Sequence, residues 1–278
     1  MTEALTRRQR WERRQRRRSV LAASASTVLV LLAALVAIPQ LPGYQKVRAS
    51  FFDGETFRST IGPLFRAFLY DLQIFAWCAP SILVAGMAIA LARSVRSPAL
   101  FPLRLAATVY TDGVRGVPVI LWIYLIGFGV PGLLQSRTWS KPVLWGSLAL
   151  IAAYAAYVAE VFRAGIESVH ESQRAAARSL GMSSFQTLRY VVLPQAVRRV
   201  IPPLMNDLVS LQKDVALVSI LGPVEALRRA QSFKSTFANF TPYVGAALLF
   251  VLVSVPMTRL TDHLLQRERR RMSATAVR

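Results

Sequence analysis

Five stretches of 18 to 24 consecutive residues carry no charged side chain, and they constrain the fold more than any other feature of the chain. A helix needs about 20 mostly apolar residues to cross a bilayer, so each stretch suits one crossing. The stretches are Val20–Ile38, Leu72–Ala92, Gly116–Ser136, Pro142–Ala159 and Ser235–Thr258. A sixth candidate, Pro202–Gly222, is weaker because it contains charged residues. We therefore predict an all-α polytopic membrane protein with about six transmembrane helices.

The composition excludes several other classes of protein. Only 17% of the 278 residues are charged and 54% are hydrophobic, whereas a soluble domain has about 25% charged residues. So high a hydrophobic content also excludes intrinsic disorder. A single cysteine, Cys78, excludes an internal disulfide, and the isolated His170 and His263 argue against a metal site. The net charge of +20 is typical of nucleic-acid-binding proteins, so the positions of the charges must decide.

The basic residues are distributed as the positive-inside rule requires for six crossings. With the N-terminus in the cytoplasm, 24 of the 34 Lys and Arg residues fall in cytoplasmic segments. Without a crossing at 202–222, the cluster Arg267–Arg271 would lie outside the cell, so the charges support the sixth helix. The Arg residues are divided among separate loops, which argues against nucleic acid and favours anionic membrane lipids as their partners. We predict that both termini are cytoplasmic.

The segment order follows from these spans. The first apolar stretch is too long for a signal peptide, and no small-residue cleavage site follows it, so we predict that this helix is retained. The loop after it contains Pro39, Pro42, Gly43, Gly54 and Gly62, and we expect it to be irregular. The predicted segments are a basic cytoplasmic segment (1–19), an N-terminal transmembrane helix (20–38), an extracytoplasmic loop (39–67), a transmembrane domain (68–265) with a cytoplasmic loop (163–199), and a basic cytoplasmic tail (266–278).

The cytoplasmic loop contains residues that start and end helices, and their positions predict two short helices joined by a sharp bend. Glu171–Leu180 is rich in helix-forming residues, and Gly181 is well placed to end that helix. Ser183 followed by Gln186 forms a capping box for a second helix, whose far end Pro194 should limit. A basic loop that merely binds lipid headgroups would explain the Arg residues of this loop but not its Gly, Ser and Pro.

The order of residues in this loop resembles that of ABC importer permeases. Their pattern is Glu-Ala-Ala, three residues, Gly, nine residues, then Ile-x-Leu-Pro. This chain has Ala175-Ala176-Ala177, Gly181 and Val191-Val192-Leu193-Pro194 at the same spacing, with Ala175 in place of Glu and Val191 in place of Ile. Further stretches resemble the polar-amino-acid branch of these permeases, and the resemblance covers about residues 68–265. These stretches are Arg115–Pro118, Tyr157–Ile166, Leu211–Asp214 and Leu217–Ser219.

The resemblance implies a non-catalytic permease subunit of the bacterial plasma (inner) membrane that forms the pathway for polar or charged amino acids. It implies three protein partners: a dimer of ATPase subunits, a second permease subunit of the same or a different kind, and an extracytoplasmic solute-binding protein. It implies no cofactor, because the partner ATPase binds ATP, and the sequence contains no phosphate-binding P-loop. The residues expected to couple to the ATPase are Ala175, Ala176, Ala177, Gly181, Leu193 and Pro194.

Charged residues inside a span are candidates for the substrate pathway. Asp207, Ser210 and Asp214 share one face of the sixth span, and Asn206 and Lys213 share a neighbouring face. Such a pathway suits an amino acid, which carries both charges. The alternative is that Lys213 and Asp214 lie near the outer interface or brace a contact between helices.

Glu160 is a further pathway candidate, at the inner end of the fourth span. Its spacing from Arg163 also predicts a salt bridge between them. We expect Arg115 to extend toward the interface or to bind loop backbone.

Two other functions remain as alternatives to the importer subunit. A secondary transporter or channel would work without ATP. A polytopic membrane enzyme is less favoured, because the acid-rich span has no His or Cys nearby. The amino acid carried, the identity of the paired permease, the effect of Ala175 and the role of the N-terminal helix stay open.

Overall fold

The computed structural model of the chain describes residues 7–95, 97–135 and 141–276, so residues 1–6 and 277–278 of the two predicted basic ends lie outside it. Within the described residues the chain forms helices and short connections, without a strand. It divides into two compact units, Met1–Gly54 and Glu55–Arg278. The prediction of an all-α protein is confirmed.

The first unit consists of α1 (Arg7–Ala37), η1 (Ile38–Gln40) and α2 (Tyr44–Phe51). Residues Arg18–Gln40 are long and apolar enough to cross a membrane, and none of their most apolar window is buried inside the structure. An apolar surface of this length is stable in hydrocarbon. The unit therefore has the properties of the predicted N-terminal transmembrane helix.

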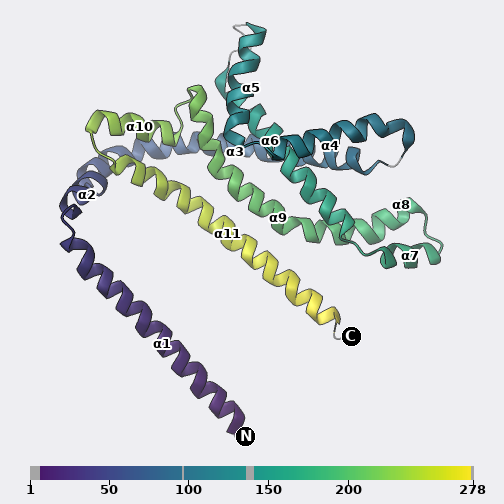
Figure 1. The fold of residues 1–278 in the computed structure, drawn as a ribbon, viewed down its shortest axis with the longest axis horizontal. Coiled ribbons are helices and arrows are strands. Elements are labelled where there is room, and N and C mark those ends of the chain that lie inside the picture. The colour runs from purple at the N-terminus through teal and green to yellow at the C-terminus, as the bar shows by residue number, and fades with distance from the viewer. Residues whose placement is uncertain (1–6, 96, 136–140, 277–278) are drawn as a thin grey trace. The chain divides into compact units, whose positions relative to one another are not determined.

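The second unit contains the remaining helices, and Figure 1 shows α7 and α8 where α6 ends and α9 begins, with α10 beside the start of α11. In chain order they are α3 (Gly54–Ser94), η2 (Pro98–Leu100), α4 (Phe101–Arg115), α5 (Val119–Leu134), α6 (Pro142–Glu167), α7 (Glu171–Ser179), α8 (Ser184–Gln186), η3 (Thr187–Val192), α9 (Leu193–Asp214), η4 (Val215–Leu221), α10 (Ala226–Phe237) and α11 (Thr241–Ala276).

Within the described residues, four segments are long and apolar enough to cross a membrane, or five if α4 and α5 together form one crossing. The axes of these two helices differ by 111°. The bend falls just before Pro118, where proline disfavours helical backbone at the preceding residue. α9 is not among these candidate membrane-crossing segments, which agrees with the charged residues that it contains. The predicted number of six crossings is therefore approximate, and the sixth depends on α9.

The segment 39–67 is helical, so the expectation of an irregular loop is wrong. It contains α2 and the first turns of α3, and α3 continues through Pro63. Leu64 and Phe68 are buried in an apolar cluster with residues of α10 and α11, and Ile61 packs against it. Burial of these side chains offsets the backbone hydrogen bond that proline removes.

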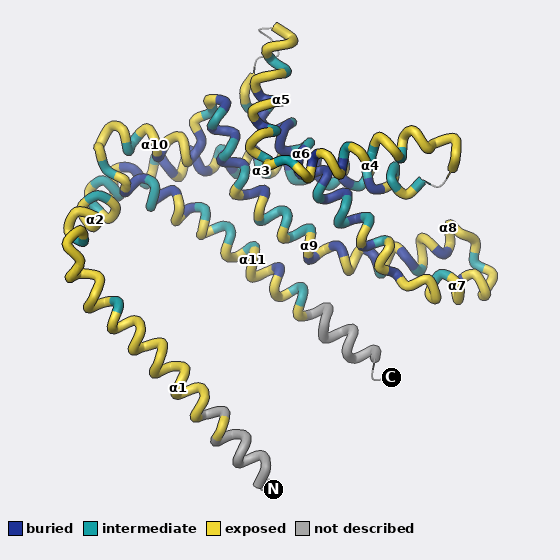
Figure 2. The backbone as a smooth tube through the Cα atoms, in the orientation of Figure 1, coloured by how far each residue is buried: buried dark blue, intermediate teal, exposed yellow. Residues whose placement is uncertain are grey.

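α6 is the central helix of the second unit. In its most apolar window 56% of the residues are buried, compared with 28% in the segment that contains α3 and 22% in α11. Small residues on α6 allow neighbouring helices to approach closely. They are Gly146, Ala149, Ala153, Ala156 and Ala159. Buried residues of α6 share one apolar cluster with Ile82 of α3 and Leu211 of α9; Figure 2 colours the buried residues dark blue.

Candidate functional site

The predicted cytoplasmic loop folds as two helical segments that meet at Gly181. α7 begins after His170, whose Nδ1 accepts a hydrogen bond from the N–H of Ser172 at 3.2 Å. Gly181 adopts a left-handed φ of 80°. The N–H groups of Gly181 and Met182 donate to carbonyl oxygens of α7 at 2.9 and 3.2 Å, which closes the end of that helix. The predicted helix stop at Gly181 is confirmed.

The predicted capping box is also present. The N–H of Gln186 donates to Oγ of Ser183 at 3.2 Å, and the N–H of Ser183 donates to Oε1 of Gln186 at 2.8 Å. The second segment then continues through a π-helical stretch into α9 without leaving helical backbone at Leu193. Pro194 therefore does not limit the second helix, contrary to the prediction. It lies at the junction between the π-helical stretch and α9, within one continuous helical run.

The loop is fixed to the ends of α6 and α9. A small apolar cluster joins the two helices at the base of the loop, and its members are Ile166, Val169, Val192 and Ala196. Nη2 of Arg174 donates to the carbonyl oxygen of Ile166 at 2.9 Å, and Nη1 of Arg199 donates to Oγ of Ser168 at 3.0 Å. These contacts attach the loop to both α6 and α9.

Most of the predicted coupling residues are exposed on this loop. Ala175, Ala176, Gly181, Leu193 and Pro194 are accessible to a partner. Ala177 is instead buried within the chain, with 4% of its surface exposed. Its small side chain serves the packing of α7 rather than an outside contact.

Three large exposed side chains of the loop, between residues 180 and 190, were not singled out from the sequence. Leu180 is 83% exposed, Phe185 67% and Tyr190 64%. The sequence signal that could have found them is a large apolar or aromatic side chain in a predicted cytoplasmic loop rich in Arg, Ser and Ala. Together we call Leu180, Phe185 and Tyr190 the bend patch.

Glu160 lies in an ion-pair cluster at the end of α6. The predicted Glu160–Arg163 salt bridge is confirmed. Oε2 of Glu160 also lies 2.8 Å from Nη1 of Arg93 on α3 and 3.7 Å from Nη1 of Arg115 on α4. Arg115 thus lies near a carboxylate, where we expected it to extend toward the interface or to bind loop backbone. The cluster joins α3, α4 and α6, so Glu160 stabilises the contact between these three helices.

The charged residues of α9 do not form one site. Asp214 faces α6, where it accepts a hydrogen bond from the hydroxyl of Tyr154 at 2.8 Å. Lys213 is exposed and lines a cavity against α10 and α11. Among the described residues no carboxylate lies within ion-pair distance of Lys213, so the predicted alternative of a Lys213 ion-pair brace has no support.

The other pathway candidates on α9 differ in exposure. Asn206 and Ser210 are exposed. Asp207 is half-buried, and its Oδ2 is buried without a hydrogen-bond partner in the described part of the chain. The structure therefore places these candidates on α9 as the helical spacing predicted, with no common ligand-binding arrangement.

A pair of buried acids was not found from the sequence. Asp71 of α3 is 1% exposed, and Glu225, just before α10, is fully buried. Glu225 caps α10 by accepting hydrogen bonds from the N–H groups of Leu227 and Arg228, both at 2.7 Å. Asp71 accepts one from the N–H of Ala226 at 3.1 Å, and the two carboxyl groups lie close enough to interact. Burial raises the pKa of the Glu225 carboxyl.

Comparison with protein families matches residues 83–270 to the binding-protein-dependent transport system inner membrane component family. A putative glutamine transport system permease protein of Rickettsia felis is 35% identical over 173 residues, 62% of this chain and 77% of that protein. A probable amino-acid permease protein of Bacillus subtilis is 30% identical over 181 residues, 65% of this chain and 80% of that protein.

Solved structures share the fold. An amino acid ABC transporter, crystallised with histidines, superposes with a TM-score of 0.68 at 30% identity, covering 74% of this chain and 94% of that one. Inward-facing MetNI, a methionine ABC transporter, gives a TM-score of 0.60 at 16% identity, covering 73% of this chain and 95% of that one. At that identity the second likeness concerns the fold alone.

Proposed function

This chain belongs to the binding-protein-dependent transport system inner membrane components, and we propose that it forms the translocation pathway of an ATP-driven amino-acid importer. In this proposal the chain has no catalytic activity, and a separate ATPase dimer supplies the energy. Its relatives are transport permeases for glutamine or other amino acids, which supports this cargo class. The amino-acid transporter with the same fold supports it as well.

The observation that carries the coupling step is the bend patch on its anchored loop. Large apolar side chains at 64% to 83% exposure are costly in water and suit a protein partner. The loop that holds them is tied to α6 and α9 by an apolar cluster and two arginine hydrogen bonds. In our proposal the ATPase binds the bend patch, and its closure moves α6 and α9 together.

The remaining partners follow from the same proposal. A second permease subunit, identical or related, completes the pathway by a two-fold arrangement. An extracytoplasmic solute-binding protein delivers the amino acid at the opposite side of the membrane. The basic termini lie in the cytoplasm, where anionic headgroups attract them.

Co-purification of the chain with the ATPase from a neighbouring reading frame tests this function. We expect the wild-type complex in proteoliposomes to hydrolyse ATP faster when the solute-binding protein and its amino acid are added. Phe185→Glu should reduce ATPase recovery at least about tenfold, because the lost burial of one aromatic side chain is worth about 1.5–3 kcal/mol. Equal recovery and equal turnover with Phe185→Glu would contradict the proposed contact.

Phe52→Glu is a matched control for the bend patch. Phe52 is 66% exposed, close to the 67% of Phe185, but it lies just after α2, in the predicted extracytoplasmic segment 39–67. This variant should retain the ATPase at wild-type levels. Uptake by vesicles that contain the chain without any ATPase would instead identify a secondary transporter.

A further inference from the structure

A groove lies between α3 and the start of α6, two helices that are each long and apolar enough to cross a membrane. Its volume is about 620 Å³, and small-molecule sites in proteins have volumes of about 300–1,000 Å³. Gln73 and Trp77 line the groove from α3, and Lys141 and Leu144 line it from the start of α6. The groove is therefore large enough to hold part of an organic molecule.

The start of α6 sets the depth of the groove in the membrane. The apolar segment of α6 begins at Pro142, and Lys141 immediately precedes it. The carbonyl oxygen of Lys141 accepts a hydrogen bond from the N–H of Leu144 at 3.0 Å, which fixes the lysine backbone at the first turn of the helix. The exposed side chain of Lys141 therefore lies at the level of the lipid headgroups, where long basic side chains extend.

α3 lies in register with this part of α6. Sγ of Cys78 donates a weak hydrogen bond to the carbonyl oxygen of Ser147 at 3.9 Å. Gln73 lies near the outer end of the uncharged stretch 72–92, and Trp77 lies one turn deeper and is 51% exposed. The wall beside Trp77 is apolar and includes Ile74. The groove is therefore polar near the headgroups and apolar below them.

Two polar groups of the groove have no partner among the residues that the structure describes. No carboxylate lies within 4.0 Å of the ammonium group of Lys141. The exposed side-chain amide of Gln73 makes no hydrogen bond with these residues. A polar group on the surface of a membrane-crossing helix is costly unless it finds a partner. An anionic group that accepts hydrogen bonds and carries a hydrocarbon chain would satisfy both side chains and the apolar wall.

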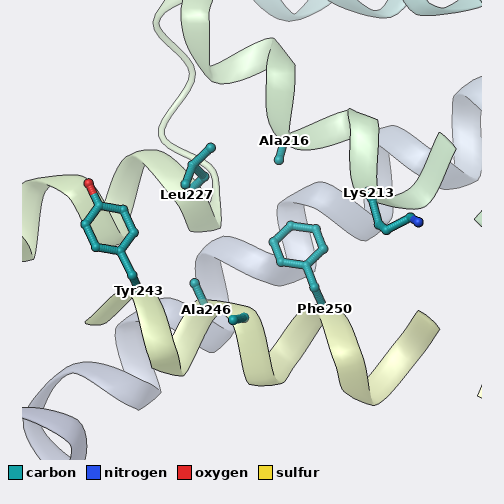
Figure 3. Close-up of a pocket in the computed structure, with 7 residues that line it drawn as sticks. Lys213, Ala216, Leu227, Tyr243, Ala246 and Phe250 are labelled. Carbon is teal, nitrogen blue, oxygen red and sulfur yellow. The ribbon is translucent and has the colours of Figure 1, made fainter. Parts of the chain in front are cut away.

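The smaller cavity between α9, η4, α10 and α11 lacks this arrangement. Its volume is about 250 Å³ and its lining is mostly apolar. Figure 3 shows the ammonium group of Lys213 directed away from the other lining residues. Of these two spaces, the groove between α3 and α6 is the one with unpaired polar groups above an apolar wall.

We propose that the groove between α3 and α6 binds an anionic phospholipid of the outer leaflet, with its phosphodiester on the ammonium group of Lys141. One acyl chain lies along Trp77 and Leu144, and Gln73 donates a hydrogen bond to the headgroup. A phospholipid is the occupant because hydrocarbon surrounds both helices at this depth, and the unpaired positive charge selects an anionic headgroup over a zwitterionic one. This site goes beyond the proposed function, because it requires neither a transported solute nor an ATPase.

Fluorescence quenching of the full-length chain in nanodiscs tests this site. The nanodiscs contain phosphatidylcholine and a varied fraction of a lipid with brominated acyl chains, either phosphatidylglycerol or phosphatidylcholine. Bromine quenches a tryptophan that it contacts, and the difference between wild type and Trp77→Phe isolates the signal of Trp77. We expect half-maximal quenching at an about fivefold lower fraction of brominated phosphatidylglycerol, since a basic residue near an anionic headgroup contributes about 1 kcal/mol.

Variants of Lys141 separate its charge from its size. Lys141→Met should reduce the preference for phosphatidylglycerol to within about twofold, and Lys141→Glu should reverse it. Lys141→Arg should retain the preference, because the positive charge is kept. As a control, Lys46→Met removes an exposed lysine of α2, in the predicted extracytoplasmic segment 39–67, and should behave as the wild type does.

Four results would each overturn the proposal. One is equal quenching of Trp77 by the two brominated lipids in the wild type, and another is an unchanged preference in Lys141→Met. A third is a Trp77 signal that neither lipid quenches, because the groove is then covered by another segment of the chain or by a second copy. The fourth is loss of the preference in millimolar inorganic phosphate at constant ionic strength, which would assign the site to free phosphate.

Discussion

The acids Asp71 and Glu225 are almost completely buried and lie side by side, so it is costly to ionise them there. Two such carboxyl groups do not both ionise at low cost. The hydrogen bonds from the start of α10 favour the ionised forms, and burial opposes them. The result is a junction between α3 and α10 whose stability depends on protonation.

The raised pKa of Glu225 predicts a pH dependence of stability. Its folded pKa lies above the ordinary value of 4.5, so the folded state holds a proton that the unfolded state has lost. Stability should fall as pH rises from about 4.5 through the raised pKa and then level off. We expect Glu225→Gln, which stays neutral, to show a smaller fall in Tm over this range, measured on the purified protein in detergent.

A control for this prediction is available in α3. Glu55 is exposed in the first turn of that helix, and Glu55→Gln should leave the pH profile of Tm as in the wild type. A profile of Glu225→Gln that falls as steeply as the wild-type profile would show that Glu225 does not titrate in this range.

At the scale of elements, the close contact between α3 and α6 depends on small residues. A Cβ at Gly86 of α3 would lie 2.5 Å from Cγ1 of Val158 on α6. At Gly113 of α4 nothing lies within 4 Å of the same position. Both glycines lie within helices, so the two sites differ in the space available.

Alanine at these two glycines should therefore have opposite effects. Gly86→Ala should lower stability by about 1–3 kcal/mol, because it overpacks the α3–α6 contact. Gly113→Ala should be neutral or raise stability by up to about 1 kcal/mol, because alanine favours helix. Unfolding of the purified protein in detergent measures both. Equal effects of the two substitutions would show that α3 moves away from α6 without cost.

In the cytoplasmic loop, local capping sets the helices and tertiary packing attaches them to the rest of the second unit. Its two segments are set by local capping at Gly181 and Ser183, whereas its attachment to α6 and α9 requires the cluster around Val169 and Val192. The π-helical stretch Thr187–Val192 lies between these two parts. Single π-helical turns within α-helices occur frequently at functional sites.

For the whole molecule, the distribution of basic residues predicts that α7 and α10 lie on opposite sides of the membrane. Ser172 on α7 and Ser232 on α10 are both exposed, and the single Cys78 is buried. In a Cys78→Ser background, Ser232→Cys should react with a membrane-impermeant maleimide in intact spheroplasts. Ser172→Cys should react only after lysis, because the loop is cytoplasmic.

This labelling pattern also tests the sixth crossing. If α9 does not cross, α10 and α7 are on the same side and the two cysteines react together. A second pair nearer the ends of the chain, Gln15→Cys and Gln266→Cys, checks whether both ends share the cytoplasmic side with α7.

The sequence alone determined whatever depends on neighbours within a few residues. The apolar stretches, the stop at Gly181, the Ser183–Gln186 capping box and the Glu160–Arg163 pair all follow from composition or helical spacing. These features need only backbone geometry and the length of a bilayer crossing. The resemblance in the loop also led to the family that the comparisons show.

Only the tertiary structure decided which distant residues meet. Asp71 contacts the start of α10 across 155 positions, and Tyr154 reaches Asp214 across 60. Helical spacing already places Lys213 and Asp214 on different faces of α9, and the assembled helices decide that Asp214 meets Tyr154 of α6. Tertiary packing also accounts for α3 remaining helical through Pro63. Burial of Leu64 against α10 and α11 outweighs the tendency of proline to interrupt a helix. Helical spacing along the chain shows which face of a helix is buried but not which helix lies against it, so these contacts are decided only once the helices are assembled.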